Sequence, residues 1–156
     1  MLIENKSLGK IAIASDHAGY KVKEMLKQFL KQFGYDFIDI GPDNEDSVDY
    51  PDFAFKVAES VSAGGSKNGI LICGTGLGMC ISANKVNGIR AVTAYDRVTA
   101  EMSRRHNDAN VLCLGARVLS EPSIKEIVKV WLETSFDLDN PRHQRRIQKI
   151  SDYEVD

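Results

Sequence analysis

The sequence predicts an α/β fold whose core is a five-stranded parallel sheet. Short apolar runs alternate with longer runs of helical periodicity five times along the chain, which is the pattern of repeated strand–helix units. Small and polar residues follow the first, third and fifth apolar runs, and in a parallel sheet these positions lie at one edge. Because crossovers between parallel strands are right-handed, helices cover both faces of such a sheet. We therefore expect a Rossmann-like three-layer α/β/α sandwich.

The regular pattern begins with the apolar run KIAIAS at 10–15, which predicts a short buried strand. Apolar residues then recur at helical spacing from Val22 to Phe33, and Gly34 follows as the expected end of that helix. The run DFIDI at 36–40 predicts the second strand.

The polar sequence GPDNEDSVDYP predicts a loop at 41–51. An apolar helical pattern over 54–61 predicts a second helix that ends before Gly64–Gly65. The third strand is expected at 69–73, GILIC, and the third helix at 79–86, MCISANKV.

The run RAVTAY at 90–95 predicts the fourth strand, and the fourth helix follows at 96–105 with Asp96 as its N-cap. The fifth strand is expected at 110–115, and Ser120-Glu121-Pro122 is a typical start for the fifth helix. A basic helix at 142–150 and an acidic tail at 151–156 complete the chain. No repeat or linker interrupts the pattern, so residues 1–156 are expected to form a single domain.

The composition is that of an ordinary globular domain, with 43% hydrophobic and 27% charged residues. A net charge of −2 gives no electrostatic reason to expect nucleic acid or an anionic membrane as a partner. The sequence has no long apolar stretch and no signal-peptide pattern, and its three cysteines form no CxxC motif. A cytoplasmic protein without a disulfide framework or a zinc site is therefore expected.

The most informative segment is ICGTGLG at 72–78, where a buried strand ends at Cys73 and three glycines alternate after it. Glycine lets the backbone approach a ligand closely, and the amides of such a loop favour anions. The segment thus offers a nucleophile or base beside an oxyanion or phosphate cradle. It could also be a dinucleotide-binding loop, although Met79 stands where a third glycine belongs, or a simple tight turn. A P-loop is excluded because no GK[ST] follows the glycines. The other two cysteines, Cys80 and Cys113, lie inside apolar patterns and fit buried structural thiols.

Other polar residues have both a structural and a chemical interpretation. Asp16–His17 could cap a strand end or belong to the site, and His106 lies where turn residues are also expected. Arg142 and Arg146 are four residues apart, so they share one face of a helix. That face could be simply solvated, or it could bind a phosphate dianion through forked guanidinium donors.

Taken together, these motifs closely resemble the type B ribose-5-phosphate isomerase family, which also includes galactose-6-phosphate isomerase subunits. In chain order, the matching pieces are SDHAG (15–19), DYP (49–51), ICGTGLG (72–78), SANK (82–85), GIRA (88–91), RHND (105–108), LGAR (114–117) and RHQRR (142–146). The family contains members with a cysteine base and members with a glutamate base further into the glycine loop. Cys73 makes this chain similar to the cysteine type.

The resemblance implies a role for each candidate residue. Cys73 resembles the base that moves a proton between two sugar carbons, and Asp16 and Thr75 resemble residues that handle the sugar hydroxyls. His106 resembles the acid that opens the furanose ring. The residues implied in substrate binding are His17, Tyr50, Gly74, Gly76, Leu77, Gly78, Asn107, Arg117, Arg142 and Arg146. Of these, His17 and the three arginines resemble phosphate ligands, and the loop amides resemble an oxyanion hole.

The activity implied is the interconversion of D-ribose 5-phosphate and D-ribulose 5-phosphate through an enediolate, a step of the pentose phosphate pathway. No metal and no cofactor is implied. The alternatives are an isomerase of a six-carbon sugar phosphate, such as galactose 6-phosphate or allose 6-phosphate, and a non-catalytic nucleotide-binding module. The resemblance also implies a homodimer or tetramer whose sites combine residues of two subunits.

Overall fold

The five expected strands form one parallel sheet. The structure is a computed structural model, and it describes residues 9–155. The strands are β1 (Ile11–Ser15), β2 (Phe37–Gly41), β3 (Asn68–Cys73), β4 (Ala91–Thr93) and β5 (Val111–Gly115). They are hydrogen-bonded in the order β2-β1-β3-β5-β4, and every pairing is parallel.

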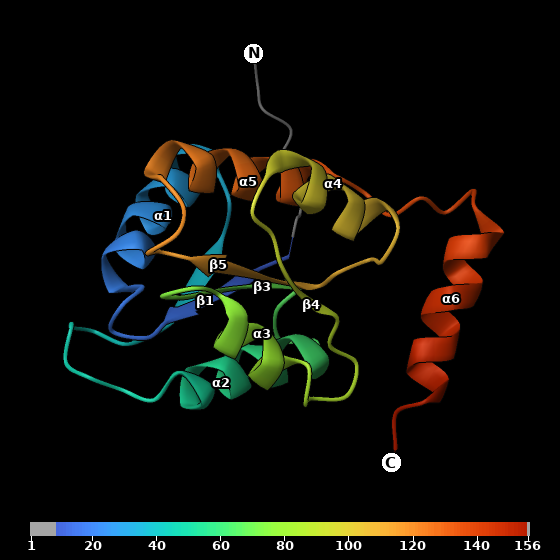
Figure 1. The fold of residues 1–156 in the computed structure, drawn as a ribbon, viewed down its shortest axis with the longest axis horizontal. Coiled ribbons are helices and arrows are strands. Elements are labelled where there is room, and N and C mark those ends of the chain that lie inside the picture. Colours follow the sequence, from blue (N-terminus) through green and yellow to red (C-terminus); the bar gives the residue numbers. More distant parts are fainter. Residues whose placement is uncertain (1–8, 156) are drawn as a thin grey trace.

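Helices cover both faces of this sheet, which confirms the expected three-layer sandwich (Figure 1). They are α1 (Tyr20–Gln32), α2 (Tyr50–Ser62), α3 (Leu77–Ala83), α4 (Arg97–Arg105), α5 (Glu121–Glu133) and α6 (Pro141–Asp152). Helices α1, α4 and α5 share one face, and α2 and α3 share the other. Alternate residues of β3 supply the two cores: Ile70 and Ile72 pack toward α1 and α5, and Leu71 and Cys73 toward α2 and α3.

Several boundaries differ from the expected ones for identifiable reasons. Helix α2 begins at Tyr50, because Pro51 fits the first turn of a helix, where its missing N–H is not needed. Helix α3 begins at Leu77, directly after Gly76, whose φ of +83° is left-handed, and ends at Ala83; the side-chain amide of the next residue, Asn84, bonds to the backbone of Ala91. Asp96 caps α4 as expected, through a capping box with Thr99.

Helix α6 stands apart from the sandwich, on the side of the molecule away from α1 (Figure 1). It extends through Asp152, so the first two residues expected in the tail are helical, and it has no buried residue. Contacts at both ends hold it. The imidazole of His143 stacks on that of His106 with 4.4 Å between ring centroids. Beyond its C-terminal end, a carboxylate oxygen of Glu154 accepts the N–H of Gly88 at 2.8 Å. Within residues 9–155, no helix is long and apolar enough to cross a membrane.

Candidate active site

Three neighbouring strands, β1, β3 and β5, deliver their following loops to one edge of the sheet. The N–H of Asp16 donates to the carbonyl of Ile72 at 3.1 Å, which ties the first loop to the end of β3. On the other side, the N–H of Ala116 donates to the carbonyl of Cys73 at 2.8 Å, and that of Arg117 to the carbonyl of Gly74 at 2.9 Å. Asp16, Cys73 and Arg117 are thus held at the carboxyl edge of the sheet, where ligands bind in folds of this type.

Cys73 ends β3 with its side chain 5% exposed. Its Sγ accepts a hydrogen bond from the N–H of Gly76 at 3.1 Å. The sulfur is therefore the acceptor of a fixed backbone donor, and the thiol proton need not be used in this contact. The side chain packs in the core toward α2 and α3, and the loop that follows it orients the sulfur.

Two glycines of the loop are required by its shape. Gly76 has φ +83°, and a Cβ there would lie 3.0 Å from Cγ2 of Thr93. Gly78 faces the ring of Tyr50, and a Cβ there would come within 2.6 Å of it. The loop and Tyr50 are therefore in direct contact, which brings the start of α2 to the same edge.

The outer side of the loop is open. Thr75 is exposed, and its Oγ1 accepts the N–H of Leu77 at 3.3 Å. The carbonyl of Thr75 accepts the hydroxyl of Tyr95 at 3.3 Å. Sequence reasoning missed Tyr95, whose signal was its place at the end of the fourth predicted strand. A fixed loop beside open space can receive a small ligand.

The loop after β1 contributes two oriented groups. Asp16 is 6% exposed, and its Oδ1 accepts the N–H of Gly19 at 3.0 Å, which leaves the second carboxylate oxygen for other partners. Nδ1 of His17 accepts the N–H of Val48 at 3.3 Å. Because Nδ1 is an acceptor, the neutral ring carries its proton on Nε2 and can donate from there.

Four candidate residues lie at the opposite edge of the sheet. His106 and Asn107 follow α4 and precede β5, near Asn110, whose carbonyl accepts the N–H of Gly69 at the start of β3. From Gly69 to Cys73 the strand advances four residues, or ~13 Å at about 3.3 Å per residue. Within one chain, His106 and Asn107 are therefore remote from Cys73.

Helix α6 begins beside His106, so Arg142 and Arg146 are also remote from Cys73. Both arginines are exposed. The pKa of His143 is lowered, mainly by desolvation and secondly by the neighbouring His106. The stacking of the two imidazoles therefore disfavours a charge on the His143 ring.

The other two cysteines differ from each other. Cys113 is buried, and burial raises the pKa of its thiol well above the ordinary value. Cys80 is only half-buried, and a hydrogen bond from the Cys113 thiol is the main cause that lowers the pKa of Cys80 to about 6. The expectation of a buried structural thiol therefore fits Cys113 and is wrong for Cys80, because one side of α3 is open to solvent. Over residues 9–155, the structure groups no three His, Cys, Asp or Glu side chains in an arrangement that could hold a metal ion.

Comparisons with known proteins agree on one family. A model of the family "Ribose/Galactose Isomerase" matches residues 11–150. Ribose-5-phosphate isomerase B of Escherichia coli is 42% identical, over 91% of this chain and 94% of that protein. The structure of ribose-5-phosphate isomerase B from Clostridium thermocellum is 50% identical, with a TM-score of 0.89 over 92% of this chain and 95% of that one.

Two further relatives bear on the range of substrates. A ribose-5-phosphate isomerase B structure from Mycoplasma genitalium, with bound ribulose-5-phosphate, is 44% identical, with a TM-score of 0.87 over 92% of this chain and 95% of that one. The D-erythrulose-4-phosphate isomerase of Pectobacterium atrosepticum is 40% identical over 92% of this chain and 94% of that protein. Sequence, fold and extent of the match agree: this chain is an isomerase that belongs to the ribose/galactose isomerase family, the family of the type B ribose-5-phosphate isomerases.

Proposed function

We propose that the protein interconverts D-ribose 5-phosphate and D-ribulose 5-phosphate, the reaction that serves the pentose phosphate pathway. The observation that carries the proposal is the thiol of Cys73, fixed by the N–H of Gly76 at the open carboxyl edge of the sheet. A relative of similar fold binds ribulose-5-phosphate, which supports a pentose phosphate as the ligand of this edge.

The reaction requires a base, a place for negative charge and proton transfer between two oxygens. In the proposed mechanism the Cys73 thiolate takes the proton from C2 of the open-chain aldose, and the electron pair moves into a C1–C2 double bond as the C1 carbonyl becomes an enediolate oxygen. Backbone N–H groups of the loop 74–78 stabilise this charge. Asp16 and Thr75 move a proton between O1 and O2, and the Cys73 thiol returns a proton to C1.

The phosphate group is proposed to bind to one histidine and three arginines, which come from two different parts of the fold. His17 offers Nε2–H, because its Nδ1 is occupied by Val48. Arg117 lies against Gly74, where a Cβ would come within 3.4 Å of its guanidinium Nη1. Arg142 and Arg146 supply two further forked donors from α6.

A second subunit is proposed to complete the site. In this proposal the edge opposite Cys73 supplies groups to the substrate of the other subunit; these groups are His106, Asn107, Arg142 and Arg146. Exposed apolar side chains support the pairing of subunits. Ile81 on α3 and Val98 on α4 are 65% and 63% exposed, and Tyr153 at the end of α6 is 90% exposed. In a two-fold dimer, the exposed apolar side chains of α3 and α4 in one subunit can pack against the end of α6 in the other subunit, and symmetry repeats this contact. A tetramer would repeat such dimers.

Initial rates with phosphorylated aldoses of four, five and six carbons test the substrate assignment. We expect the highest kcat/KM with ribose 5-phosphate and a very low value with unphosphorylated ribose, because the phosphate contacts are then absent. Equal values for ribose and its phosphate would contradict the proposal. Higher values for galactose 6-phosphate or allose 6-phosphate would favour a six-carbon substrate, and a preference for the four-carbon sugar would align this chain with the Pectobacterium relative. Binding of adenine nucleotides without isomerisation would favour the non-catalytic alternative.

A further inference from the structure

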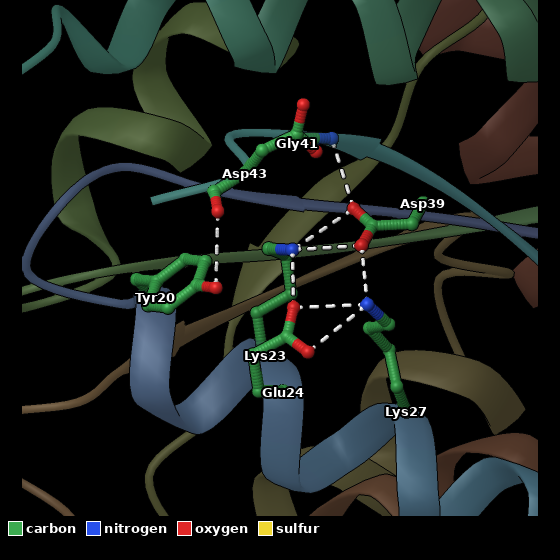
Figure 2. A network of polar contacts seen from close by, with 7 residues as sticks. All are labelled: Tyr20, Lys23, Glu24, Lys27, Asp39, Gly41 and Asp43. Atoms are coloured by element: carbon green, nitrogen blue, oxygen red, sulfur yellow. Dashed lines mark hydrogen bonds and ion pairs between the residues drawn. The ribbon is translucent and has the colours of Figure 1, made fainter. Parts of the chain in front are cut away.

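A network of charged side chains joins α1 to β2 (Figure 2). Its centre is Lys23, whose side chain is fully buried. Nζ of Lys23 contacts both oxygens of Asp39, at 2.8 and 3.0 Å, and Oε1 of Glu24 at 2.9 Å. Lys27 completes the network through Asp39 at 2.7 Å and Glu24 at 2.9 Å. Two positive and two negative charges are thus held together.

Such a network is a poor source of stability. Desolvation of buried charges offsets most of the gain from pairing, and apolar residues of similar volume are often as stabilising. The geometry points to another use, since the same groups hold the loop 42–49 that connects β2 to α2. Oδ1 of Asp39 accepts the N–H of Gly41 at 2.9 Å, just before this loop. The Tyr20 ring lies 5.2 Å from Nζ of Lys23, and its hydroxyl donates to the carbonyl of Asp43 at 3.1 Å, inside the loop.

The far end of the same loop reaches the site. Val48 donates its N–H to Nδ1 of His17, and Tyr50, two residues later, packs on Gly78. The first contact fixes the ring of His17 and its tautomer, and the second positions the start of α2 against the glycine loop. The loop is therefore anchored at one end by the charge network and at the other end orients a group of the candidate site.

We propose that the Lys23–Asp39 network is a positioning device for substrate binding, which acts through the loop 42–49 on His17. This inference rests on the proposed function in one respect, because it takes His17 as a ligand of the sugar phosphate. Neither Lys23 nor Asp39 touches the substrate. Their removal should therefore weaken substrate binding and leave the proton transfer at Cys73 nearly unchanged.

Three variants separate positioning from stability. Tyr20→Phe removes the Asp43 anchor without disturbing a buried charge. Lys23→Met with Asp39→Leu removes the network together with the acceptor for Gly41. Lys23→Met with Asp39→Asn is the matched comparison, because it also removes the ion pairs, whereas the asparagine amide oxygen can still accept the N–H of Gly41. A buried residue far from the loop, Ile127→Val on α5, controls for a general loss of stability.

Two measurements are needed. In steady-state kinetics with ribose 5-phosphate, we expect the leucine-containing double variant to raise KM about tenfold, the loss of one charge-assisted contact, with kcat within about twofold. Tyr20→Phe should raise KM about threefold, and Ile127→Val should stay near wild type. The asparagine-containing double variant, which keeps only the Gly41 contact, should have a KM between that of the wild type and that of the leucine-containing variant. In a His17→Ala background the double variant should raise KM no further, because coupled residues are not additive.

The second measurement needs no substrate. Nitrogen-15 NMR of the imidazoles, of which the chain has three, should show His17 protonated on Nε2 in the wild type and a mixture of tautomers in Tyr20→Phe and in the leucine-containing double variant. If folded variants keep the wild-type KM and tautomer, the positioning role is overturned. If the double variant does not fold, Tyr20→Phe decides by itself. If the wild type does not isomerise sugar phosphates, the proposed function fails, and the tautomer shift still tests the link between the loop and His17.

Discussion

Mixed dimers of two inactive variants test whether the site is shared between subunits. Cys73→Ala removes the proposed base, and His106→Ala removes the proposed ring-opening acid. In one chain these residues lie toward opposite edges of the sheet, and β3 advances ~13 Å between Gly69 and Cys73 at about 3.3 Å per residue. Because His106 lies at the edge of the sheet opposite Cys73, we expect the acid that acts on a substrate at Cys73 to come from a second subunit.

The expected recovery follows from two-fold symmetry. Random association of the two variants gives mixed dimers in about half of the population, and each mixed dimer has one intact site and one site that lacks both residues. About a quarter of all sites should therefore be restored, or about half in purified mixed dimers. If both residues came from the same chain, every site would lack one of them and nothing would be restored.

The two variants can be co-expressed with different affinity tags and the mixed dimers isolated by two successive purifications. Rates should be measured early and at low temperature, because spontaneous ring opening supplies open-chain substrate to the His106→Ala enzyme. We expect an initial rate near half that of the wild type. A rate no higher than the average of the two parent homodimers would refute the shared site.

Three further predictions follow from individual groups. Arg142→Ala combined with Arg146→Ala should strongly raise KM for ribose 5-phosphate in steady-state assays, because each substitution removes a charge-assisted contact worth ~1.5–3 kcal/mol; an unchanged KM would exclude these arginines from phosphate binding. Because the thiolate is the reactive form, iodoacetamide labelling of Cys80, followed by peptide mass spectrometry, should increase as pH rises through about 6, whereas Cys113 stays unlabelled. EDTA should leave the initial rate unchanged; a reversible loss restored by a divalent ion would reveal a metal requirement.

The fold was predictable because its signals are local and repeated. Apolar runs, helix caps and the alternation of strand and helix determine the three layers, and right-handed crossovers leave little freedom in their arrangement. Asp16, Cys73 and Arg117 were predictable as neighbours for the same reason, since all follow parallel strands. The strand order itself was not predictable, because it depends on which strand pairs with which across the sheet.

The sequence could not reveal how the site is oriented. Lys23 was not singled out from the sequence, although it lies three residues before Leu26 and seven before Leu30 on the buried stripe of α1. Its partner, Asp39, lies on strand β2, and only the folded chain brings the two together. Backbone donors such as the N–H of Val48 leave no trace in a sequence, because every residue except proline carries one.

The most direct test of the account follows the carbon-bound proton itself. Ribose 5-phosphate carrying deuterium at C2 is given to the wild type and to the Cys73→Ala variant, and cleavage of the C2–deuterium bond is followed by NMR. The fold of the variant is checked by circular dichroism. We predict that the wild type breaks this bond at every turnover and that Cys73→Ala, although folded, breaks it slower by about 10²–10⁴-fold or more. Cleavage by Cys73→Ala at a rate near that of the wild type would contradict the assignment of Cys73 as the base.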